Sequence, residues 1–309
     1  MKLGVIGCGN VGYNWLKLLK IKGFDVLGYE VSETAKKHIK LNFGSKCLAT
    51  KFSEMARCDI VFECVPTDPK NESGECDLSI LESVVTDFAS LEDIPNYQCK
   101  VFVQRSTCPP GTAKKYSRFF KKTEYAVNPS FIRKNKQWED TINPERIAIA
   151  GNKKSIELLR NIYSSFNTPI LALNNYEAIE LLKYMENITD AVLISLWNEF
   201  LTISDDLSIP RSDFLKIVDS FVERDKFRTA IRVSGQAFGL WCLPKDLNAL
   251  IYMFSNKQIS VMRGALETNQ LIKQIYGITP YDGADLYKII DGKIVLTQNG
   301  RKYLSTVRL

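Results

Sequence analysis

The chain has 309 residues, a length that suggests about two domains and a substantial core. Hydrophobic residues make up 45% of it and charged residues 25%, the mix of an ordinary globular protein. No apolar run approaches the roughly 18 residues of a membrane span, and no signal peptide precedes the first predicted strand. The net charge of +6 is spread along the chain and mixed with acids, which favours a phosphate-bearing substrate over nucleic acid.

The numbers and spacing of histidines and cysteines limit the kinds of catalytic and metal site that the chain can form. His38 is the only histidine, which argues against a histidine-based triad and against a His-rich metal site. The eight cysteines form no CxxC pair and show no zinc-ligand spacing, so we expect no metal. This pattern suggests reduced thiols and a cytoplasmic protein.

The first predicted unit is a strand–turn–helix–strand over residues 2–30. A strand at 3–6 meets a glycine turn, and strand 25–29 ends in Glu30. The glycines permit the bend, the approach of a pyrophosphate and close helix packing, while the helix N-terminus favours phosphate. Glu30 follows Gly12 by 18 residues, near the spacing of about 20 for an acid that binds a ribose hydroxyl. Since a carboxylate repels a 2′-phosphate, we predict that NAD is bound by Gly7, Gly9, Asn10, Val11, Gly12 and Glu30.

Strands and helices then alternate up to residue 173. Further strands are predicted at 48–50, 59–65, 101–103, 125–127, 146–150 and 169–172. Helices are predicted at 53–57, 78–88 and 154–166, with a basic helix around Lys114, Lys115 and Arg118. This alternation predicts an α/β fold, in which 1–173 is an NAD-binding domain with a doubly wound, mostly parallel Rossmann-type sheet.

An all-helical domain is predicted for 174–276. Its helical patterns cover 177–203, 207–221, 227–233, 247–254 and 259–275. The first of these is long and apolar, and we expect it to form a homodimer interface. Residues 277–309 are predicted to form a hairpin over 287–295, turning at Asp291-Gly292, and a basic tail.

Two groups of residues could carry chemistry. Cys242 lies beside Lys245 and Asp246; the lysine would favour the nucleophilic thiolate, and the acid could orient a water or the thiol, although such a cysteine is more often structural. Lys183 and Asn187 are four residues apart on the long helix and therefore share one face. If buried, they could stabilise a developing oxyanion; otherwise they form a solvated face.

The ordered motifs resemble the UDP-glucose/GDP-mannose 6-dehydrogenase family over about residues 1–273. The matching pieces are Gly7–Gly12 with Glu30, Val65-Pro66-Thr67, Asp77-Leu78-Ser79, Ser106-Thr107 with Gly111-Thr112, Asn128-Pro129 with Phe131-Ile132, Asn143-Pro144-Glu145-Arg146, Lys183 with Asn187 and Asn198-Glu199, and Gly239 with Cys242-Leu243-Pro244-Lys245-Asp246.

The resemblance implies a four-electron oxidation of a nucleotide-sugar C6 alcohol to a carboxylate with two NAD⁺. The aldehyde would be held on Cys242 as a thiohemiacetal, oxidised to a thioester and hydrolysed. Lys183 and Asn187 would hold the oxyanion, while Asp246 and Thr107 would assist the water. Cofactor contacts would include Val65, Thr67 and Lys245, and substrate contacts Phe131, Ile132, Phe238 and Gly239. Arg228 and Arg232 are candidates for the substrate phosphates, or else lie on a surface helix face.

The sequence departs from the family pattern at three places. Ser130 and Lys134 stand where the family motif carries glutamates, so water activation must be weaker or come from elsewhere. Leu240 and Trp241 follow Gly239 where the family has a glycine pair. We therefore expect a truncated member, since the roughly 35 residues after 273 cannot build the family's C-terminal nucleotide-binding domain.

Two other functions remain open at this stage. One is a two-electron dehydrogenase of the β-hydroxyacid type, which would release one NADH per substrate and would not need Cys242. The other is a non-catalytic relative that binds NAD or a nucleotide sugar as a scaffold or sensor.

Overall fold

The computed structural model describes residues 1–70, 74–133, 136–222, 237–238, 242–253, 255, 260–276, 287–290 and 293–296. The chain divides into two compact units. The first comprises Met1–Lys70 with Cys76–Lys183, and the second Asn71–Glu75 with Tyr184–Leu309. The helix predicted at 227–233 and the basic tail predicted at 301–309 lie outside the described residues.

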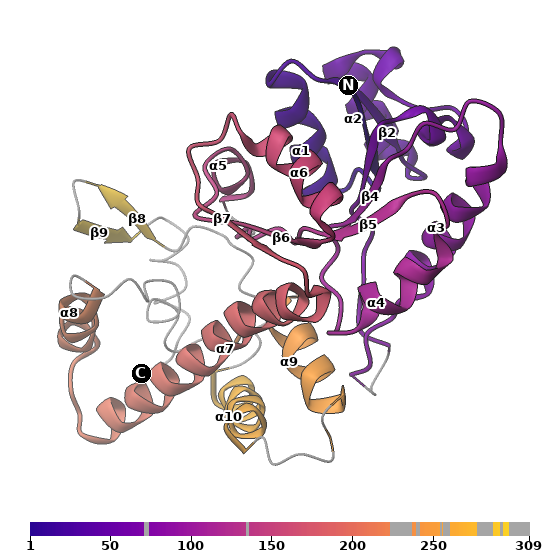
Figure 1. Ribbon diagram of the computed structural model, residues 1–309. Coiled ribbons are helices and arrows are strands. Elements are labelled where there is room, and N and C mark those ends of the chain that lie inside the picture. Colours follow the sequence, from indigo (N-terminus) through magenta and orange to yellow (C-terminus); the bar gives the residue numbers. More distant parts are fainter. Residues whose placement is uncertain are drawn as a thin grey trace. The chain divides into compact units, whose positions relative to one another are not determined.

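A seven-stranded sheet forms the centre of the first unit (Figure 1). Its strands are β1 (Lys2–Ile6), β2 (Asp25–Tyr29), β3 (Ile60–Glu63), β4 (Val101–Gln104), β5 (Glu124–Val127), β6 (Ile147–Gly151) and β7 (Ile170–Leu173). The spatial order is β2-β1-β3-β4-β5-β6-β7, and every pair is parallel except β5–β6. The predicted mostly parallel, doubly wound α/β sheet is therefore confirmed.

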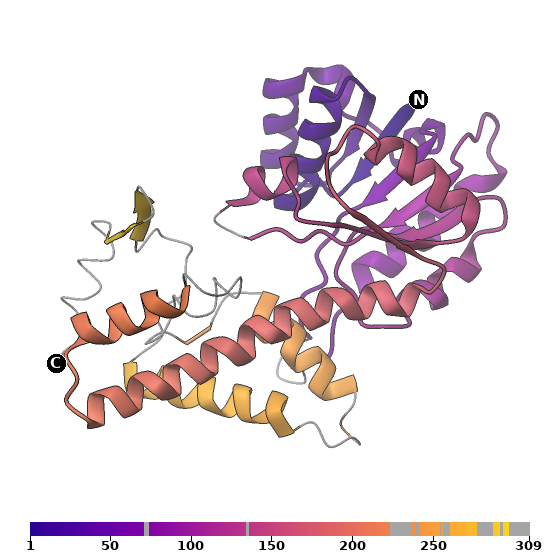
Figure 2. The ribbon, with the colours of Figure 1, turned by 60° about the vertical axis from the view of Figure 1, so that its left-hand side comes forward.

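Helices cover both faces of this sheet (Figure 2). On one face α1 (Asn10–Ile21) and α6 (Lys153–Tyr163) bury Trp15, Leu16 and Leu159 against strand residues such as Phe62. On the other face lie α3 (Ser79–Ser90), α4 (Thr112–Tyr116) and the first turns of α7 (Tyr176–Asp206), where Phe88 and Ile179 pack near Phe102. Coverage of both faces explains why the strand interiors are continuously apolar.

The connection from β1 to α1 depends on two glycines. Gly7 has φ +80°, a left-handed conformation that a side chain rarely adopts. A Cβ on Gly12 would lie 2.0 Å from the carbonyl oxygen of Gly7, so only glycine lets the first turn of α1 approach the turn this closely. A Cβ on Gly9 would meet nothing within 4 Å, which leaves the space beside that residue open.

Several local predictions are corrected by the structure. The predicted strand at 48–50 is absent: Leu48 makes only an isolated bridge to Gly28, because the preceding 3-10 helix Ser45–Cys47 brings the chain past β2 for one residue. The short helix predicted at 53–57 is a 3-10 helix, Phe52–Arg57. Two helices were not predicted, α2 (Glu33–Phe43) and α5 (Gln137–Ile142).

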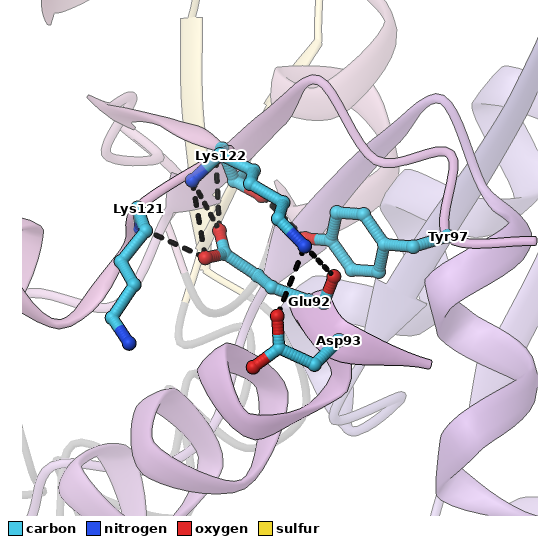
Figure 3. A network of polar contacts seen from close by, with 6 residues as sticks. Glu92, Asp93, Tyr97, Lys121 and Lys122 are labelled. Carbon is cyan, nitrogen blue, oxygen red and sulfur yellow. Dashed lines mark hydrogen bonds and ion pairs between the residues drawn. The ribbon is translucent and has the colours of Figure 1, made fainter. Parts of the chain in front are cut away.

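A buried carboxylate fixes the start of β5. Glu92, in the 3-10 helix Leu91–Asp93, is 3% exposed and accepts hydrogen bonds from the backbone N–H groups of Lys121, Lys122 and Thr123 (Figure 3). The Lys122 ammonium bonds the carbonyl oxygen of Glu92 and the carboxylate of Asp93. These contacts satisfy three successive backbone donors that precede the strand, and thereby set where β5 begins.

The second unit contains the rest of α7 together with α8 (Arg211–Val222), α9 (Cys242–Met253) and α10 (Ser260–Tyr276). Trp197 and Leu201 pack against Phe214 and Val218, which joins α7 to α8. No helix within the described residues is both long and apolar enough to cross a membrane. Strands β8 (Tyr287–Ile290) and β9 (Lys293–Leu296) pair antiparallel, as predicted, while Asp291-Gly292 lies outside the described residues.

The starts of two helices differ from the prediction. α8 begins at Arg211 rather than 207, because Ser208 has φ +54° and ends the preceding helix. α9 begins at Cys242 rather than 247. Pro244 is accommodated in its first turn, where the missing N–H costs little.

Alanine substitutions at Gly12 and Gly9 should lower the stability of the protein by very different amounts. We expect Gly12→Ala to lower the free energy of unfolding by about 3 kcal/mol or more, because the new methyl group meets a fixed backbone oxygen. Gly9→Ala, which places its methyl in open space, should cost less than about 1 kcal/mol. Urea denaturation followed by circular dichroism measures both, and equal losses would contradict this account of the turn.

Candidate active site

The glycine turn of the first unit fits a dinucleotide. The first N–H groups of any helix have no intrahelical acceptor, and Gly9, the N-cap of α1, has no side chain to accept from them. Together with the open space beside Gly9, this makes an anion site at the exposed positions Gly9 and Asn10, with Val11 half-buried next to them.

Glu30 lies directly after β2 and faces this turn. Its Oε2 accepts from the N–H of Cys8 at 2.7 Å, and its Oε1 accepts from the N–H groups of Val31 and Ser32 at 2.7 and 2.8 Å. An ionised carboxylate offers about four acceptor positions, so these three bonds leave room for about one hydroxyl donor. The carboxylate thus organises the turn and still fits the ribose contact predicted for it.

Two loops meet at the carboxyl edge of β3 and β4. The hydroxyl of Thr67 is buried and donates to the carbonyl oxygen of Thr107 at 2.7 Å. Val65, two residues earlier, is half-buried. The structure therefore brings together three predicted residues from two segments that are about 40 residues apart in sequence.

Glu63, the last residue of β3, is fully buried beneath these loops. Its Oε1 accepts from the N–H of Val65 at 2.6 Å and from the hydroxyl of Ser106 at 2.5 Å. Its Oε2 has no hydrogen-bond partner among the described residues. Burial raises the pKa of Glu63 to about 7, although the contacts with Ser106, Val65 and Arg105 act in the opposite direction.

A second buried carboxylate, Glu180 of α7, joins three elements. It accepts from the N–H groups of Gly111 and Ala113, each at 2.8 Å, and from the side-chain amide of Gln104 at 3.2 Å. Burial raises the pKa of Glu180 to about 7 against the lowering effect of these bonds. The carboxylate fixes the first turns of α7 against β4 and the start of α4.

Lys183 follows Glu180 by one helical turn. It is 7% exposed, and its ammonium lies 5.2 Å from the centre of the Phe131 ring. The guanidinium of Arg146 lies 4.8 Å from the same ring. Phe131 and Ile132 are half-buried. The first unit therefore holds a buried ammonium next to a predicted substrate residue, a cation–π arrangement.

The second unit holds a buried polar cluster of its own. Asp246 is fully buried and accepts from the amide of Asn187 through Oδ2 and from the ammonium of Lys245 through Oδ1. Lys245 also lies over the ring of Tyr184, 6.0 Å from its centre. Phe238 is buried, and its carbonyl oxygen accepts from the amide of Asn269 at 2.9 Å. Three predicted catalytic or cofactor residues, Asn187, Lys245 and Asp246, therefore lie in one cluster.

Several of the predicted site residues lie outside the part of the chain that the structure describes. Lys134, Arg228, Arg232, Gly239, Leu240 and Trp241 are not among the described residues, and only the backbone of Cys242, the first residue of α9, is described. Within the described part of the chain, no group of three or more His, Cys, Asp or Glu residues could hold a metal ion.

The sequence reasoning missed the two buried carboxylates. Glu63 could have been singled out as an acid inside an otherwise apolar strand pattern, and Glu180 as an acid among Ile179 and Leu182 on the apolar face of the long helix. What it could not supply were their partners, since Ser106, Gly111 and Ala113 come from distant segments.

The raised pKa of Glu63 predicts a pH dependence of stability. Because the folded protein holds the proton more tightly than the unfolded chain, the stabilisation is fully present below about pH 4.5 and is lost as the pH rises through about 7. We expect Glu63→Gln, which mimics the protonated carboxyl, to reduce the fall in unfolding free energy between pH 5 and pH 8 by about 2–3 kcal/mol.

Urea denaturation at the two pH values measures this difference. Glu157→Gln serves as the control, since Glu157 is exposed on α6 and its replacement should leave the pH dependence as it is. The same pH profile for Glu63→Gln and the parent protein would contradict a raised pKa.

Comparison with known proteins identifies the family. The NAD-binding domain model of the UDP-glucose/GDP-mannose dehydrogenase family matches residues 35–167, and the central domain model of the same family matches residues 177–271. The glycine turn and Glu30 precede the first matched segment.

Individual relatives agree with these matches. An uncharacterized protein of Methanocaldococcus jannaschii is 32% identical over 66% of this chain, which spans 25% of that protein. A UDP-N-acetyl-D-mannosamine dehydrogenase of Methanococcus maripaludis is 29% identical over 87% of this chain, which spans 65% of that enzyme. The solved structure of a UDP-glucose dehydrogenase from Pyrobaculum islandicum has the same fold, with a TM-score of 0.79 and 23% identity over 89% of this chain and 69% of the other. Because two domain models of the same family together cover most of the sequence, the chain belongs to the UDP-glucose/GDP-mannose dehydrogenase family.

Proposed function

We propose that this protein is an NAD-dependent oxidoreductase of the nucleotide-sugar 6-dehydrogenase type, which oxidises the C6 alcohol of a nucleotide sugar. The observation that carries the proposal is that the chain combines the family's two domains with an open glycine turn and a buried Lys183 in its first unit. Polysaccharide biosynthesis is the process that such a product would serve.

NAD is the cofactor that fits the turn. Gly7, Gly9, Asn10, Val11 and Gly12 would hold the pyrophosphate, Glu30 the ribose, and Val65, Thr67 and Lys245 the remainder of the molecule. When bound, NAD⁺ accepts two electrons as hydride in each of two successive oxidations. The buried carboxylate of Glu30 disfavours the 2′-phosphate of NADP.

Cys242 is the proposed nucleophile of the reaction. Its thiolate adds to the carbonyl carbon of the aldehyde stage, which forms a C–S bond and places negative charge on the oxygen. The first residue of a helix is a position where the helix dipole favours a thiolate. Lys183 and Asn187 stabilise the oxyanion. After oxidation to the thioester, water attacks the carbonyl carbon and the C–S bond breaks, which returns the thiolate.

Asp246 and Thr107 are proposed to orient the water that hydrolyses the thioester. Both oxygens of Asp246 already accept hydrogen bonds from Lys245 and Asn187, so the carboxylate is held in one orientation. Such an anchored carboxylate can orient a water for attack. Phe131, Ile132, Phe238 and Gly239 are proposed to contact the sugar, and Arg228 and Arg232 its phosphates.

We also propose a homodimer formed through α7, in the cytoplasm. Met185 is 57% exposed, Leu196 42% and Phe200 47%, an apolar content that favours burial against a second copy.

NADH formation tests the reaction. With NAD and a panel of UDP-sugars and GDP-mannose, we expect two NADH for each substrate consumed, and Cys242→Ala should lower the rate of the complete reaction by at least 100-fold. Cys47→Ala, at a buried cysteine of the 3-10 helix Ser45–Cys47, is the matched control and should retain activity. Turnover by Cys242→Ala equal to that of the parent, with one NADH per substrate, would favour the two-electron dehydrogenase instead.

Cofactor binding is tested separately by calorimetry. Gly9→Ala should weaken NAD binding by at least tenfold, because its methyl group occupies the space that a pyrophosphate needs, while its stability changes little. Gly264→Ala in α10, whose Cβ also meets nothing, is the control and should bind NAD as the parent does. NAD binding without turnover on any sugar nucleotide would favour the non-catalytic relative.

A further inference from the structure

The two loops at the carboxyl edge of β3 and β4 are joined through one hydroxyl group. The hydroxyl oxygen of Ser106 lies 2.5 Å from Oε1 of Glu63 and 2.5 Å from the carbonyl oxygen of Val65. Further along the same loops, the Thr67 hydroxyl donates to the carbonyl oxygen of Thr107 at 2.7 Å. The contacts of Ser106 are therefore the first of two links between the loop that leaves β3 and the loop that leaves β4.

One hydroxyl cannot serve both of its contacts unless Glu63 carries a proton. A serine hydroxyl has a single hydrogen to donate, whereas a backbone carbonyl and an ionised carboxylate only accept. Oxygens 2.5 Å apart need a hydrogen between them. A protonated Glu63 supplies the second hydrogen, because its carboxyl can donate to Ser106 while the Ser106 hydroxyl donates to Val65. Once Glu63 is ionised, its carboxylate and the Val65 carbonyl compete for one donor.

The surroundings of Glu63 favour the protonated form near neutral pH. Its carboxyl is fully buried, and burial raises its pKa to about 7 although the positive charge of Arg105 lowers that pKa. Cys64 and Tyr125 of β5 also interact with the charge of Glu63. The pKa of Cys64 is raised to about 12 and that of Tyr125 well above its usual range, so both stay neutral. Glu180, which also interacts with Tyr125, is a second carboxyl whose pKa is raised to about 7.

The segment after β3 packs directly against the glycine turn. A Cβ on Gly7 would lie 2.9 Å from the carbonyl oxygen of Cys64 and 3.1 Å from Cγ1 of Val65. A Cβ on Gly12 would lie 3.1 Å from the Cβ of Cys64. Because so little space separates the two segments, a displacement of Val65 reaches the turn. Val65 and Thr67 are themselves among the proposed contacts of NAD.

We propose that Glu63 is a positioning residue that makes the binding of NAD depend on its proton. This inference rests on the cofactor binding proposed above. With the proton in place, Glu63 and Ser106 hold Val65, and the loop after β3 keeps its position against the glycine turn. When the proton leaves, one of the two contacts of Ser106 is lost, the loop is released and the affinity for NAD falls. By linkage, NAD must in turn draw a proton onto Glu63 when it binds.

Calorimetric titration of the full chain with NAD at pH 6 and pH 8 tests this coupling. If only the protonated form binds, a pKa of about 7 lowers the competent fraction from about 0.9 to about 0.1 over this range. We therefore expect the Kd for NAD to rise by about five- to tenfold. At pH 7 the protein should take up about half a proton for each NAD bound, measured in buffers of different ionisation enthalpy.

Glu63→Gln cannot ionise, so its Kd for NAD should be the same at pH 6 and pH 8, with no proton uptake. Glu157→Gln is the matched control, because Glu157 is exposed on α6, and this variant should keep the pH dependence of the parent. If Glu63→Gln does not fold, Ser106→Ala provides a second test. It removes the hydroxyl through which the proton acts, so its Kd should also be independent of pH.

The outcomes separate this inference from the cofactor assignment. A parent Kd that is equal at pH 6 and pH 8 would overturn the control by Glu63 and leave NAD binding intact. A pH dependence that persists in Glu63→Gln or in Ser106→Ala would also overturn it, and would point to another group such as Glu180. An absence of NAD binding at both pH values would overturn the cofactor assignment, and this inference with it.

Discussion

The carboxylate of Glu180 is the interaction on which the arrangement of the first unit depends most. It replaces water as acceptor for two backbone N–H groups at the start of α4 and for the amide of Gln104. Since an unmatched buried donor costs about 1–3 kcal/mol, displacing this side chain would leave several donors unsatisfied at once. The first turns of α7, and with them Lys183, are thus held to the sheet by polar bonds of fixed direction as well as by apolar packing.

The two faces of the sheet carry opposite kinds of buried charge. Glu63 and Glu180 lie on the face covered by α3 and α4, where desolvation raises the pKa of both groups to about 7. Arg105 lies on the face covered by α1 and α6, where its guanidinium stacks on Trp15 and donates a hydrogen bond to the side-chain oxygen of Asn128. The charge of Arg105 nevertheless acts on Glu63, whose pKa it lowers against the effect of burial. A change of charge on one face of the sheet can therefore reach the other face through Glu63 and Arg105.

How much could be predicted from sequence depended on the range of the interactions involved. The turn at Gly7–Gly12 and strand β2 were predicted correctly because each glycine serves a local geometric requirement and the apolar runs are bounded by clear turn residues. The strand at 48–50 was wrong, because its pairing partner decides whether an extended segment becomes a strand. The buried partners of Glu63 and Arg105 could not be predicted, since they come from segments up to about 60 residues away. The antiparallel direction of β6 could not be predicted either. It arises because the short helix α5, between β5 and β6, does not carry the chain back across the sheet.

That change of direction at β6 decides where the long helix points. Strand β7 runs parallel to β6, so the chain leaves the sheet at the amino edge of the first five strands. The hydroxyl of Tyr176 donates to the carbonyl oxygen of Tyr125, near the beginning of β5, and Glu180 then bonds Gln104 at the end of β4. The helix therefore travels from tail to head of the parallel strands and delivers its ammonium among the loops that cradle ligands in folds of this kind. If β6 and β7 ran in the same direction as the first five strands, the same helix would start at the opposite edge of the sheet and lead away from those loops. Lys183 would then lie far from any ligand that they bind.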